Sequence, residues 1–386
     1  MKSLNRDYYN KAFSHIYVEE TVRAHPRTKA VLERFPDAVQ IPIHHYKDVF
    51  CRKKQDVALQ EKRPALILAA KEGRLIYEGA PVCQSFGNEY FYYTSCVMNC
   101  VYNCEYCYLK GMYPSGNIVV FVNLEDIFAE LEEILQKHPV YLCVSYDTDL
   151  MALEDLTGFV ESWLEFVRSH AGIRIEIRTK CGRTDLWDRL KLDENAIFSF
   201  TLSPERIRRE CEHGTASLEG RLRCAARAME HGFPVRLCFD PIIYCPDWRT
   251  QYDAMLDQVR KQIDMEKVWD VSVGSFRISQ DYMKKLRRSQ KDSAVVQFPF
   301  VNEKGVYHYQ DRLMNEMEQH VVSRICEWMP EEKIFRCTVG TLHETVTGNG
   351  LTKTSLIVVG NCLGDNYLRS LLYHPDFTTE FRKGAQ

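Results

Sequence analysis

Four cysteines stand close together in the stretch YFYYTSCVMNCVYNCEYCYLKGMY, which begins at Tyr90. Three of them, Cys100, Cys104 and Cys107, follow a C-x3-C-x2-C spacing. Thiolates so spaced can hold three corners of an iron–sulfur cluster on one loop and leave a fourth iron open to a substrate or cofactor. The alternative is a tetrahedral zinc site with Cys96 as fourth ligand, although zinc sites usually combine two paired cysteine elements across a longer spacer.

The composition is that of a globular protein in a reducing compartment. The chain has 386 residues, 45% hydrophobic and 27% charged, and it carries 15 cysteines, an odd number. The stretch MKSLNRDYYNKAFSH at the N-terminus is polar, and no apolar run reaches the roughly eighteen residues of a membrane span. We therefore expect a cytoplasmic protein with reduced thiols and no membrane partner. The net charge of −3 gives no indication of nucleic-acid binding.

Short β-rich runs alternate with amphipathic helices from about residue 90 onward. This alternation predicts a parallel sheet in which each strand is followed by a helix. Six units are two fewer than a full barrel has, so the expected fold is α/β with an open, partial (β/α)6 barrel. Its chemistry should lie at the C-terminal ends of the strands, and the cysteines follow the first strand. The expected strands are 89–94, 140–146, 173–179, 196–202, 235–241 and 268–276.

The patterns divide the whole chain into three parts. Residues 1–88 indicate an N-terminal α/β segment, 89–290 the partial barrel, and 291–386 a C-terminal extension with a hairpin, a helix and a tail. Two clearly amphipathic helices are expected over 123–138 and 153–170.

A resemblance to a known family extends these observations. The cysteine spacing, with an aromatic residue before Cys107, is similar to the signature of the radical S-adenosylmethionine (SAM) enzymes. Further stretches resemble one family among them, the spore photoproduct lyases: CEYCYLKGMYPSGNIVVFVNLEDIF, RTK at 178–180, EHGTASLEGRLRCAARAMEHGF and GVYHYQ. They occur in matching order over most of residues 10–330. The resemblance implies a radical SAM barrel and a carbon–carbon lyase.

The resemblance also implies the chemistry and the partners. In radical SAM enzymes a reduced 4Fe-4S cluster cleaves SAM, and the 5′-deoxyadenosyl radical abstracts a hydrogen atom from the substrate. In spore photoproduct lyases the substrate is 5-thyminyl-5,6-dihydrothymine in DNA, which is returned to two thymines. The expected cofactors are the 4Fe-4S cluster and SAM. The expected partners are DNA with a thymine lesion and an electron donor such as a flavodoxin or ferredoxin, for a protein that acts as a monomer.

Residue by residue, the resemblance assigns Cys100, Cys104 and Cys107 as the cluster ligands. It places Tyr106 beside the cofactor and, together with Tyr108, in a hydrogen-atom relay. Cys96 lies outside the signature and is interpreted as a bystander.

Three further residues match positions that bind SAM in the family. Lys180 corresponds to the lysine that reaches the SAM carboxylate, and Thr148 and Thr201 stand where the family has serine hydroxyls near the methionyl part. Each has a plain structural alternative, because threonine favours strands and a lysine at a strand end is often simply solvated.

The chain departs from the family at the residue that returns hydrogen to the product radical. The family commonly has a cysteine there, and this chain has Tyr146, with Cys143 three residues upstream. Side chains alternate along a strand, so the two should face opposite sides, and Cys143 should face away if Thr148 faces the cofactor. Cys83, in the loop before the first strand, is then the expected hydrogen donor, and Cys143 the alternative.

Binding a lesion inside DNA requires the dinucleotide to leave the duplex stack, and a basic rim to hold the backbone. The stretch RISQDYMKKLRRSQK is the most basic window of the chain and the expected phosphate-binding segment. The following hairpin resembles the family hairpin that contacts the lesion, through Tyr307 and Tyr309, with Lys304 at its turn. The basic residues concerned are Arg277, Lys284, Lys285, Arg287, Arg288 and Lys291. The alternatives are a solvated helix face and ordinary cross-strand packing.

The alternative function is a radical SAM enzyme of the same lineage that acts on a different substrate. The altered donor position and the neutral overall charge keep this alternative open. A non-enzymatic iron–sulfur or zinc protein is a more distant alternative.

Overall fold

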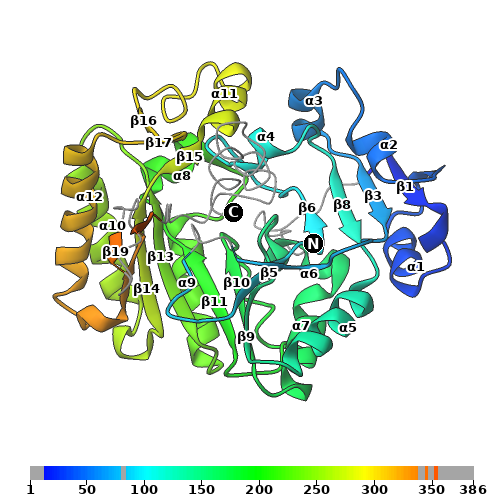
Figure 1. Cartoon of the computed structure of the whole chain (residues 1–386), viewed down its shortest axis with the longest axis horizontal. Helices are drawn as coiled ribbons and strands as arrows, with labels where there is room; N and C mark the ends of the chain where they lie inside the picture. The colour runs from blue at the N-terminus through cyan, green and yellow to red at the C-terminus, as the bar shows by residue number, and fades with distance from the viewer. Residues whose placement is uncertain (1–12, 80–83, 338–343, 347–351, 355–386) are drawn as a thin grey trace, which may run out of the picture.

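The computed structural model describes residues 13–79, 84–337, 344–346 and 352–354, and these contain two large sheets (Figure 1). Within this part of the chain, no helix has the length and apolar character needed to cross a membrane.

The N-terminal sheet has the strand order β2-β1-β3-β8-β6. Its neighbours are parallel except β6 and β8, which pair antiparallel. The loop between β6 and β8 contains all three signature cysteines, so this loop leaves and re-enters the N-terminal sheet. The strands are β1 (His15–Glu19), β2 (Val39–Ile43), β3 (Leu66–Ala69), β6 (Val97–Met98) and β8 (Ile118–Phe121). The short helices beside them are η1 (Glu20–Val22), α1 (Pro26–Glu33), α2 (Lys47–Phe50) and α3 (Val57–Lys62).

The main sheet has the order β18-β14-β13-β11-β10-β9-β5-β4 and contains all six predicted strands as parallel neighbours. The prediction of six parallel strands in sequence order is therefore confirmed. A short antiparallel strand extends one edge and a parallel strand the other. The strands are β4 (Ile76–Glu78), β5 (Phe91–Thr94), β9 (Val140–Cys143), β10 (Ile173–Thr179), β11 (Ala196–Thr201), β13 (Val235–Ile242), β14 (Asp270–Ser275) and β18 (Ile334–Arg336).

The two faces of the main sheet differ in chemistry, as β10 illustrates. Ile175 and Ile177 are fully buried in the hydrophobic core. Glu176 and Arg178 alternate with them and therefore point to the opposite, inner face. Glu176 there accepts a hydrogen bond from the Tyr141 hydroxyl at 2.8 Å and pairs with Arg236 at 3.2 Å. The inner face of the barrel is thus a polar, charged surface.

Helices cover the outer face of the main sheet (Figure 1). The prediction of one continuous helix over 153–170 is wrong. Gly158, with a φ of +63°, separates two helices, α6 and α7. The buried Glu154 accepts from the amides of Val160 and Glu161 at 2.7 and 3.0 Å, so its carboxylate satisfies the start of α7. The helices are α5 (Leu124–Leu135), α6 (Leu150–Thr157), α7 (Phe159–Ser169), α8 (Glu205–Cys211), α9 (Leu218–Glu230), α10 (Trp248–Gln262) and η2 (Met265–Lys267).

The C-terminal extension contains the predicted hairpin, and this prediction is confirmed. The hairpin turns at Lys304 and Gly305, which have φ values of 48° and 86°, the left-handed pair that suits a tight two-residue turn. A third strand, β15, pairs with it. Just before the extension lie β15 (Arg277–Ser279) and α11 (Gln280–Ser289). The elements of the extension are β16 (Val301–Glu303), β17 (Val306–His308), α12 (Asp311–Ile325), η3 (Glu331–Lys333), β19 (Glu344–Val346) and β20 (Thr352–Thr354).

Candidate functional site

The loop with the signature cysteines lies at the C-terminal side of β5 and is tied to the barrel by a small antiparallel pair. β7 (Asn103–Cys104) pairs with β12 (Glu212–His213), and the Glu105 amide donates to the Cys211 carbonyl at 2.8 Å. The short helix α4 (Leu109–Met112) follows Cys107. The loop is therefore fixed at its centre by residues from the segment between β11 and α9.

The three signature cysteines line one cavity in the mouth of the partial barrel. Its empty volume is about 1070 Å³, with the open solvent at the mouth included. Cys104 is buried, and Cys100 and Cys107 are partly exposed. The same cavity is lined by side chains from the ends of β9, β10, β11 and β13. The sequence-predicted loop thus faces the strand ends at which a barrel enzyme carries its chemistry.

The chemistry of these thiols fits an iron–sulfur cluster. Burial raises the pKa of Cys104 to about 12, and burial followed by the charges of its neighbours raises the pKa of Cys100 well above its usual value. A bound iron would supply the positive charge that such thiolates need. Among the described residues, no group of three or more His, Cys, Asp or Glu side chains converges on a point where it could hold a single ion. A cluster requires no such convergence, because each cysteine binds a different iron.

Cys96 lies apart from the other three cysteines. Its side chain is fully buried, and its thiol contacts the Val144 carbonyl at 3.7 Å. Its sulfur does not line the cavity. This location agrees with the bystander interpretation and gives no support to a zinc site with Cys96 as fourth ligand.

The residues expected to hold SAM lie on the same cavity wall. Lys180, Thr148 and Thr201 all line the cavity. The Thr148 hydroxyl is buried and has no hydrogen-bond partner among the described residues. A buried hydroxyl without a partner costs free energy unless a ligand satisfies it, so its position fits a polar cofactor. The Lys180 ammonium lies 5.7 Å from the centre of the Tyr106 ring.

Two acidic residues that the sequence patterns did not single out support this wall. Asp149 accepts hydrogen bonds from the Lys180 amide at 2.7 Å and from the Ala152 amide at 3.1 Å. The same carboxylate therefore holds the end of β10 and caps the start of α6. Glu212 is fully buried and accepts a hydrogen bond from the Tyr106 hydroxyl. Asp149 directly before a helical pattern is a cap signal that the sequence contained. Glu212 had no such signal, since Tyr106 is distant from it in sequence.

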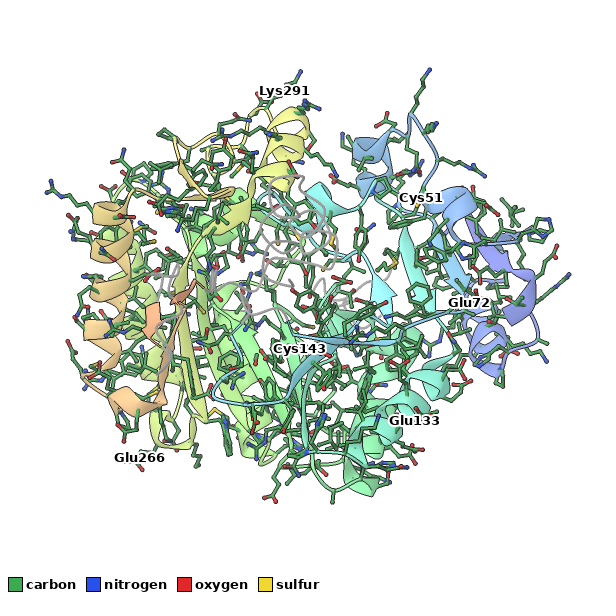
Figure 2. All side chains as sticks on the ribbon, viewed as in Figure 1. Cys51, Glu72, Glu133, Cys143, Glu266 and Lys291 are labelled. Atoms are coloured by element: carbon green, nitrogen blue, oxygen red, sulfur yellow. The ribbon has the colours of Figure 1, made fainter. Side chains whose placement is uncertain are left out.

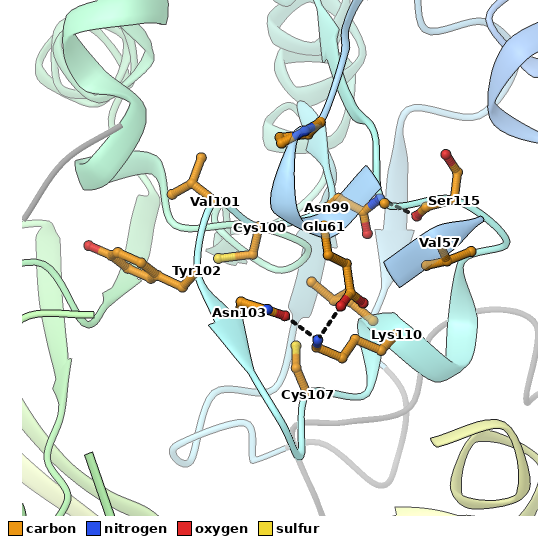
Figure 3. Close-up of a pocket in the computed structure, with 13 residues that line it drawn as sticks. Val57, Glu61, Asn99, Cys100, Val101, Tyr102, Asn103, Cys107, Lys110 and Ser115 are labelled. Carbon is orange, nitrogen blue, oxygen red and sulfur yellow. Dashed lines mark hydrogen bonds and ion pairs between the residues drawn. The ribbon is translucent and has the colours of Figure 1, made fainter. Parts of the chain in front are cut away.

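A second, smaller pocket lies on the N-terminal side of the cysteine loop (Figure 3). Cys100 and Cys107 line it as well as the barrel cavity. Across it, the Lys110 ammonium donates to Glu61 of α3 at 2.9 Å and to the Asn103 side chain (Figure 3). This clamp joins the cysteine loop to the N-terminal segment.

A family model described as spore photoproduct lyase matches residues 89–338, well over half of the chain. The chain belongs to the spore photoproduct lyase family. The prediction of family, partial barrel and radical SAM lyase class is thereby confirmed.

Individual relatives are distant in sequence and similar in fold. Spore photoproduct lyase from Geobacillus sp. (strain Y412MC61) is 22% identical over 252 residues, 61% of this chain and 73% of that protein. The Clostridium acetobutylicum relative of the same name is 24% identical over 192 residues, 47% of this chain and 56% of that one. A structure of spore photoproduct lyase complexed with dinucleoside spore photoproduct has a TM-score of 0.73 at 17% identity, covering 85% of this chain and 98% of that chain. A variant with bound AdoMet and the same dinucleoside also has a TM-score of 0.73, at 19% identity, covering 85% and 99%.

The prediction that Cys143 and Tyr146 face opposite sides is wrong. Both side chains line the barrel cavity, together with Thr148. The alternation of a strand does not extend that far, because β9 ends at Cys143, Ser145 makes only an isolated bridge to Ser95, and the chain turns at residues 146–147. Cys83, which strand parity favoured as the hydrogen donor of this member of the spore photoproduct lyase family, lies outside the described residues.

The tyrosines around the donor position form a contiguous group. Tyr146 stacks on Tyr93, with ring centres 4.3 Å apart. The Tyr108 hydroxyl donates to the Tyr146 carbonyl at 2.7 Å, and its ring meets that of Tyr146 edge-on at 6.4 Å. Tyr106 and Tyr108 both line the cavity, as the predicted relay requires.

The basic segment is only partly available to DNA. Lys284, Lys285, Arg288 and Lys291 are exposed on or just after α11. Lys291 lies at the outer edge of the molecule, whereas Cys143 lies near its centre (Figure 2). The prediction that Arg277 contacts phosphate is wrong. Its side chain is buried, with 5% exposed, and donates to the Ser275 carbonyl at 2.8 Å.

Two more predicted DNA contacts have structural roles. Arg287 is half-buried and donates to the carbonyls of Val296 and Phe298 at 3.2 and 2.9 Å. Tyr309 is 1% exposed and packs against aromatic rings, so it has no surface for DNA to contact. The prediction that Tyr309 contacts the lesion is therefore wrong. Tyr307 is partly exposed and lies under Arg287, with the guanidinium 5.0 Å from the ring centre.

Proposed function

We propose that the chain is a radical SAM lyase that returns 5-thyminyl-5,6-dihydrothymine in DNA to two thymines. The observation that carries the proposal is the meeting of three thiols with Lys180 and the partnerless Thr148 hydroxyl in one cavity of the described barrel. Family membership and the dinucleoside lesion bound in related structures support the substrate. When bound, the 4Fe-4S cluster and SAM supply the radical that abstracts hydrogen from the lesion.

The chain's own residues position the reactants. Cys100, Cys104 and Cys107 hold the cluster, and the Lys180 ammonium attracts the SAM carboxylate. The Thr148 hydroxyl donates to the cofactor a hydrogen bond that it does not make to the described part of the protein. Thr201, buried in the same wall, is the second hydroxyl. Glu212 holds the Tyr106 hydroxyl and thereby fixes the ring beside Lys180.

Hydrogen return is assigned to the thiol that faces the cavity. Cys143 donates its S–H to Glu176 at 3.4 Å, and it lines the cavity beside Tyr146. Burial disfavours a charged Glu176, but Arg178 and Arg236 outweigh it and lower the pKa of Glu176 to about 2. Glu176 therefore remains an anionic acceptor that fixes the thiol. We propose Cys143 as the donor, with Tyr106 and Tyr108 as relay residues.

The partners follow from the same scheme. An electron carrier such as a flavodoxin or ferredoxin supplies the reducing electron, and the enzyme acts in the cytoplasm as a monomer. The lesion-bearing DNA lies with its backbone along α11. This helix is next to the cysteine loop, since Gly111 of α4 has no room for a side chain against Tyr282.

The exposed cations of α11 should make DNA binding sensitive to salt. Replacing Lys284, Lys285 and Arg288 with glutamine should flatten the slope of log affinity against log salt by about one unit for each phosphate that the variant no longer touches. Fluorescence anisotropy with a labelled duplex at several salt concentrations measures the slope. A matched control variant has Arg223, Arg260 and Lys261 replaced with glutamine on the outer helices α9 and α10. This control should keep the salt dependence of the wild-type protein. Equal slopes for the two variants would assign α11 to a solvated face.

The function itself is tested with anaerobically reconstituted protein, SAM, a one-electron reductant and an oligonucleotide that carries the lesion. We expect 5′-deoxyadenosine to form and the lesion to be replaced by two thymines, as read by chromatography. The undamaged oligonucleotide is the control.

A second candidate is a radical SAM enzyme of the same lineage with another substrate. Tyr146 at the expected cysteine position favours it. Formation of 5′-deoxyadenosine while the lesion stays intact would support this candidate and contradict DNA repair.

A further inference from the structure

The cysteine loop has a second side, which faces away from the barrel cavity. Cys100 and Cys107 line the smaller pocket as well as the cavity, and α3 lines that pocket through Val57 and Glu61 (Figure 3). None of the six residues of α3 is buried, so this helix forms a thin wall between the pocket and solvent. Two of the three assigned cluster ligands are therefore reached from both sides of the loop.

The helix α3 is fixed against the residues that follow the cysteines. The Gln60 side chain accepts hydrogen bonds from the Gly116 amide at 2.9 Å and from the Ser115 hydroxyl at 3.1 Å. A Cβ added at Gly116 would lie 2.8 Å from the Glu61 amide nitrogen, so the two backbones are in direct contact. A molecule bound to the outer side of α3 would therefore have a fixed position relative to the cysteine loop.

The surface around α3 is basic, although the chain as a whole is acidic. Residues 51–64 contain five cations and two anions, a net charge of +3, whereas the whole chain has a net charge of −3. Both anions have partners inside the protein: Asp56 caps α3 by accepting from the Leu59 amide at 3.0 Å, and Glu61 pairs with Lys110 at 2.9 Å. The five cations are all exposed: Arg52, Lys53, Lys54, Lys62 and Arg63.

An apolar side chain lies between these cations in the chain. Leu59 is 59% exposed and is one of the few large hydrophobic side chains that the described residues expose. A single exposed leucine needs no explanation by itself. An apolar contact point with cations on both sides, however, matches the interfaces of electron-transfer proteins, which are small and steered by opposite charge. The five cations and Leu59 are called the α3 patch below.

We propose that the α3 patch is the docking surface for an acidic protein that carries one electron to the cluster. The inference rests on the proposed function, which needs a reduced cluster, and it adds the place where the electron enters. The docked carrier gives one electron to the oxidised cluster, and no bond forms or breaks in this step. The electron passes the α3 wall toward Cys100 and Cys107, on the side of the loop that SAM does not occupy. Reduction can therefore take place while SAM and the lesion fill the cavity.

DNA is the other macromolecule that exposed cations attract, and two observations favour the carrier. The α3 patch lies on the helix that walls the smaller pocket, whereas the residues assigned to SAM line the barrel cavity. Phosphate contacts would use the cations but would leave the exposed Leu59 without a role. DNA binding by this surface is an outcome that the experiment distinguishes.

The experiment measures how fast the hydroquinone of a strongly acidic flavodoxin reduces the reconstituted cluster in stopped flow. SAM and lesion are absent, so the readout is independent of turnover. The combined variant Lys53→Glu, Lys54→Glu, Arg63→Glu should have a second-order rate constant about 10-fold or more below that of wild-type protein at low salt, because electrostatic steering is lost. The difference should shrink as salt approaches about 1 M, where exposed charges are screened.

Three comparisons separate docking from other effects. Photoreduced deazaflavin, a small neutral reductant, needs no docking surface and should reduce the wild-type and variant clusters at equal rates. The matched control Lys191→Glu, Arg260→Glu, Lys261→Glu makes the same change of charge at exposed residues outside the α3 patch, and it should keep the wild-type rate with flavodoxin. Leu59→Ser should weaken flavodoxin binding in titration calorimetry and keep its salt dependence, since no charge is removed. Thermal unfolding confirms that each variant is folded.

The outcomes separate this inference from the proposed function. Equal flavodoxin rates for wild-type protein and the triple patch variant, or a wild-type cluster that only deazaflavin reduces, would overturn the docking surface and leave the lyase function in place. Equal flavodoxin rates together with weaker binding of a lesion-bearing duplex by the patch variant would assign the cations to DNA. Wild-type protein that forms no 5′-deoxyadenosine from SAM after deazaflavin has reduced its cluster would overturn the proposed function and this inference together.

Discussion

Replacing Cys104 with alanine should remove the cluster and reduce SAM cleavage to background. Cys104 is the most deeply placed of the three signature thiols, and its backbone pairs with Glu212 in the β7–β12 ladder. Among the described cysteines that line the cavity, only Cys100 and Cys107 share its loop. Two thiolates cannot hold a cluster that needs three corners. Iron content, visible absorption and electron paramagnetic resonance of the reconstituted variant measure the effect.

The matched control is Cys96→Ala, which removes a thiol four residues before the signature begins. Its thiol contacts the Val144 carbonyl in the hydrophobic core, so the variant should lose some thermal stability and keep its iron. Full iron in the Cys104→Ala protein, or depleted iron in the Cys96→Ala protein, would contradict the ligand assignment.

Replacing Cys143 with alanine should leave SAM cleavage intact and suppress clean repair. The thymine radical that forms during repair needs a hydrogen atom quickly, and a thiol provides one because its S–H bond is weak. Without the thiol, the radical should be diverted into side products that chromatography and mass spectrometry detect. In heavy water, wild-type enzyme should place deuterium in thymine from the exchanged thiol, and the variant should not.

Two other cysteines provide the comparison. Cys238→Ala removes a buried thiol from β13 that does not line the cavity, and it should repair cleanly. Cys83→Ala tests the donor that strand parity favoured. If the Cys83 variant no longer repairs cleanly while the Cys143 variant does, Cys83 is the donor and the cavity position of Cys143 has another purpose.

The elements that the sequence predicted are those whose signals are local. Each of the six barrel strands is a short run rich in β-formers, and the cysteine spacing lies within eight residues. Cys100, Cys104 and Cys107 could therefore be placed at the mouth of the barrel before their positions were known, and the resemblance to the family added Lys180 to the same site. The error at Cys143 came from extending alternation past the point where β9 ends, and nothing in the residues 140–146 marks that end.

The contacts that escaped prediction join residues distant in the chain. Glu212 meets Tyr106, and Asp240 meets Arg178, only because the fold brings separate segments together in the barrel. Burial is equally non-local: Arg277 looked like part of a basic surface, but the pairing of β15 with β17 covers it. Composition alone could not distinguish the buried Arg277 from Lys284, which lies in the same basic segment and is exposed.

The pairing of β8 with β3 determines which parts of this chain can be expressed as separate fragments. The match to the family begins at residue 89, but the loop of signature cysteines ends in β8, which lies between β3 and β6 in the N-terminal sheet. A fragment cut at residue 89 would lack β3, and the all-apolar, buried β8 would become an uncovered edge open to aggregation. The clamp from Lys110 to Glu61 would disappear in the same cut. The N-terminal segment and the cluster loop therefore form one structural unit in this chain, and a shortened version of the protein should keep both.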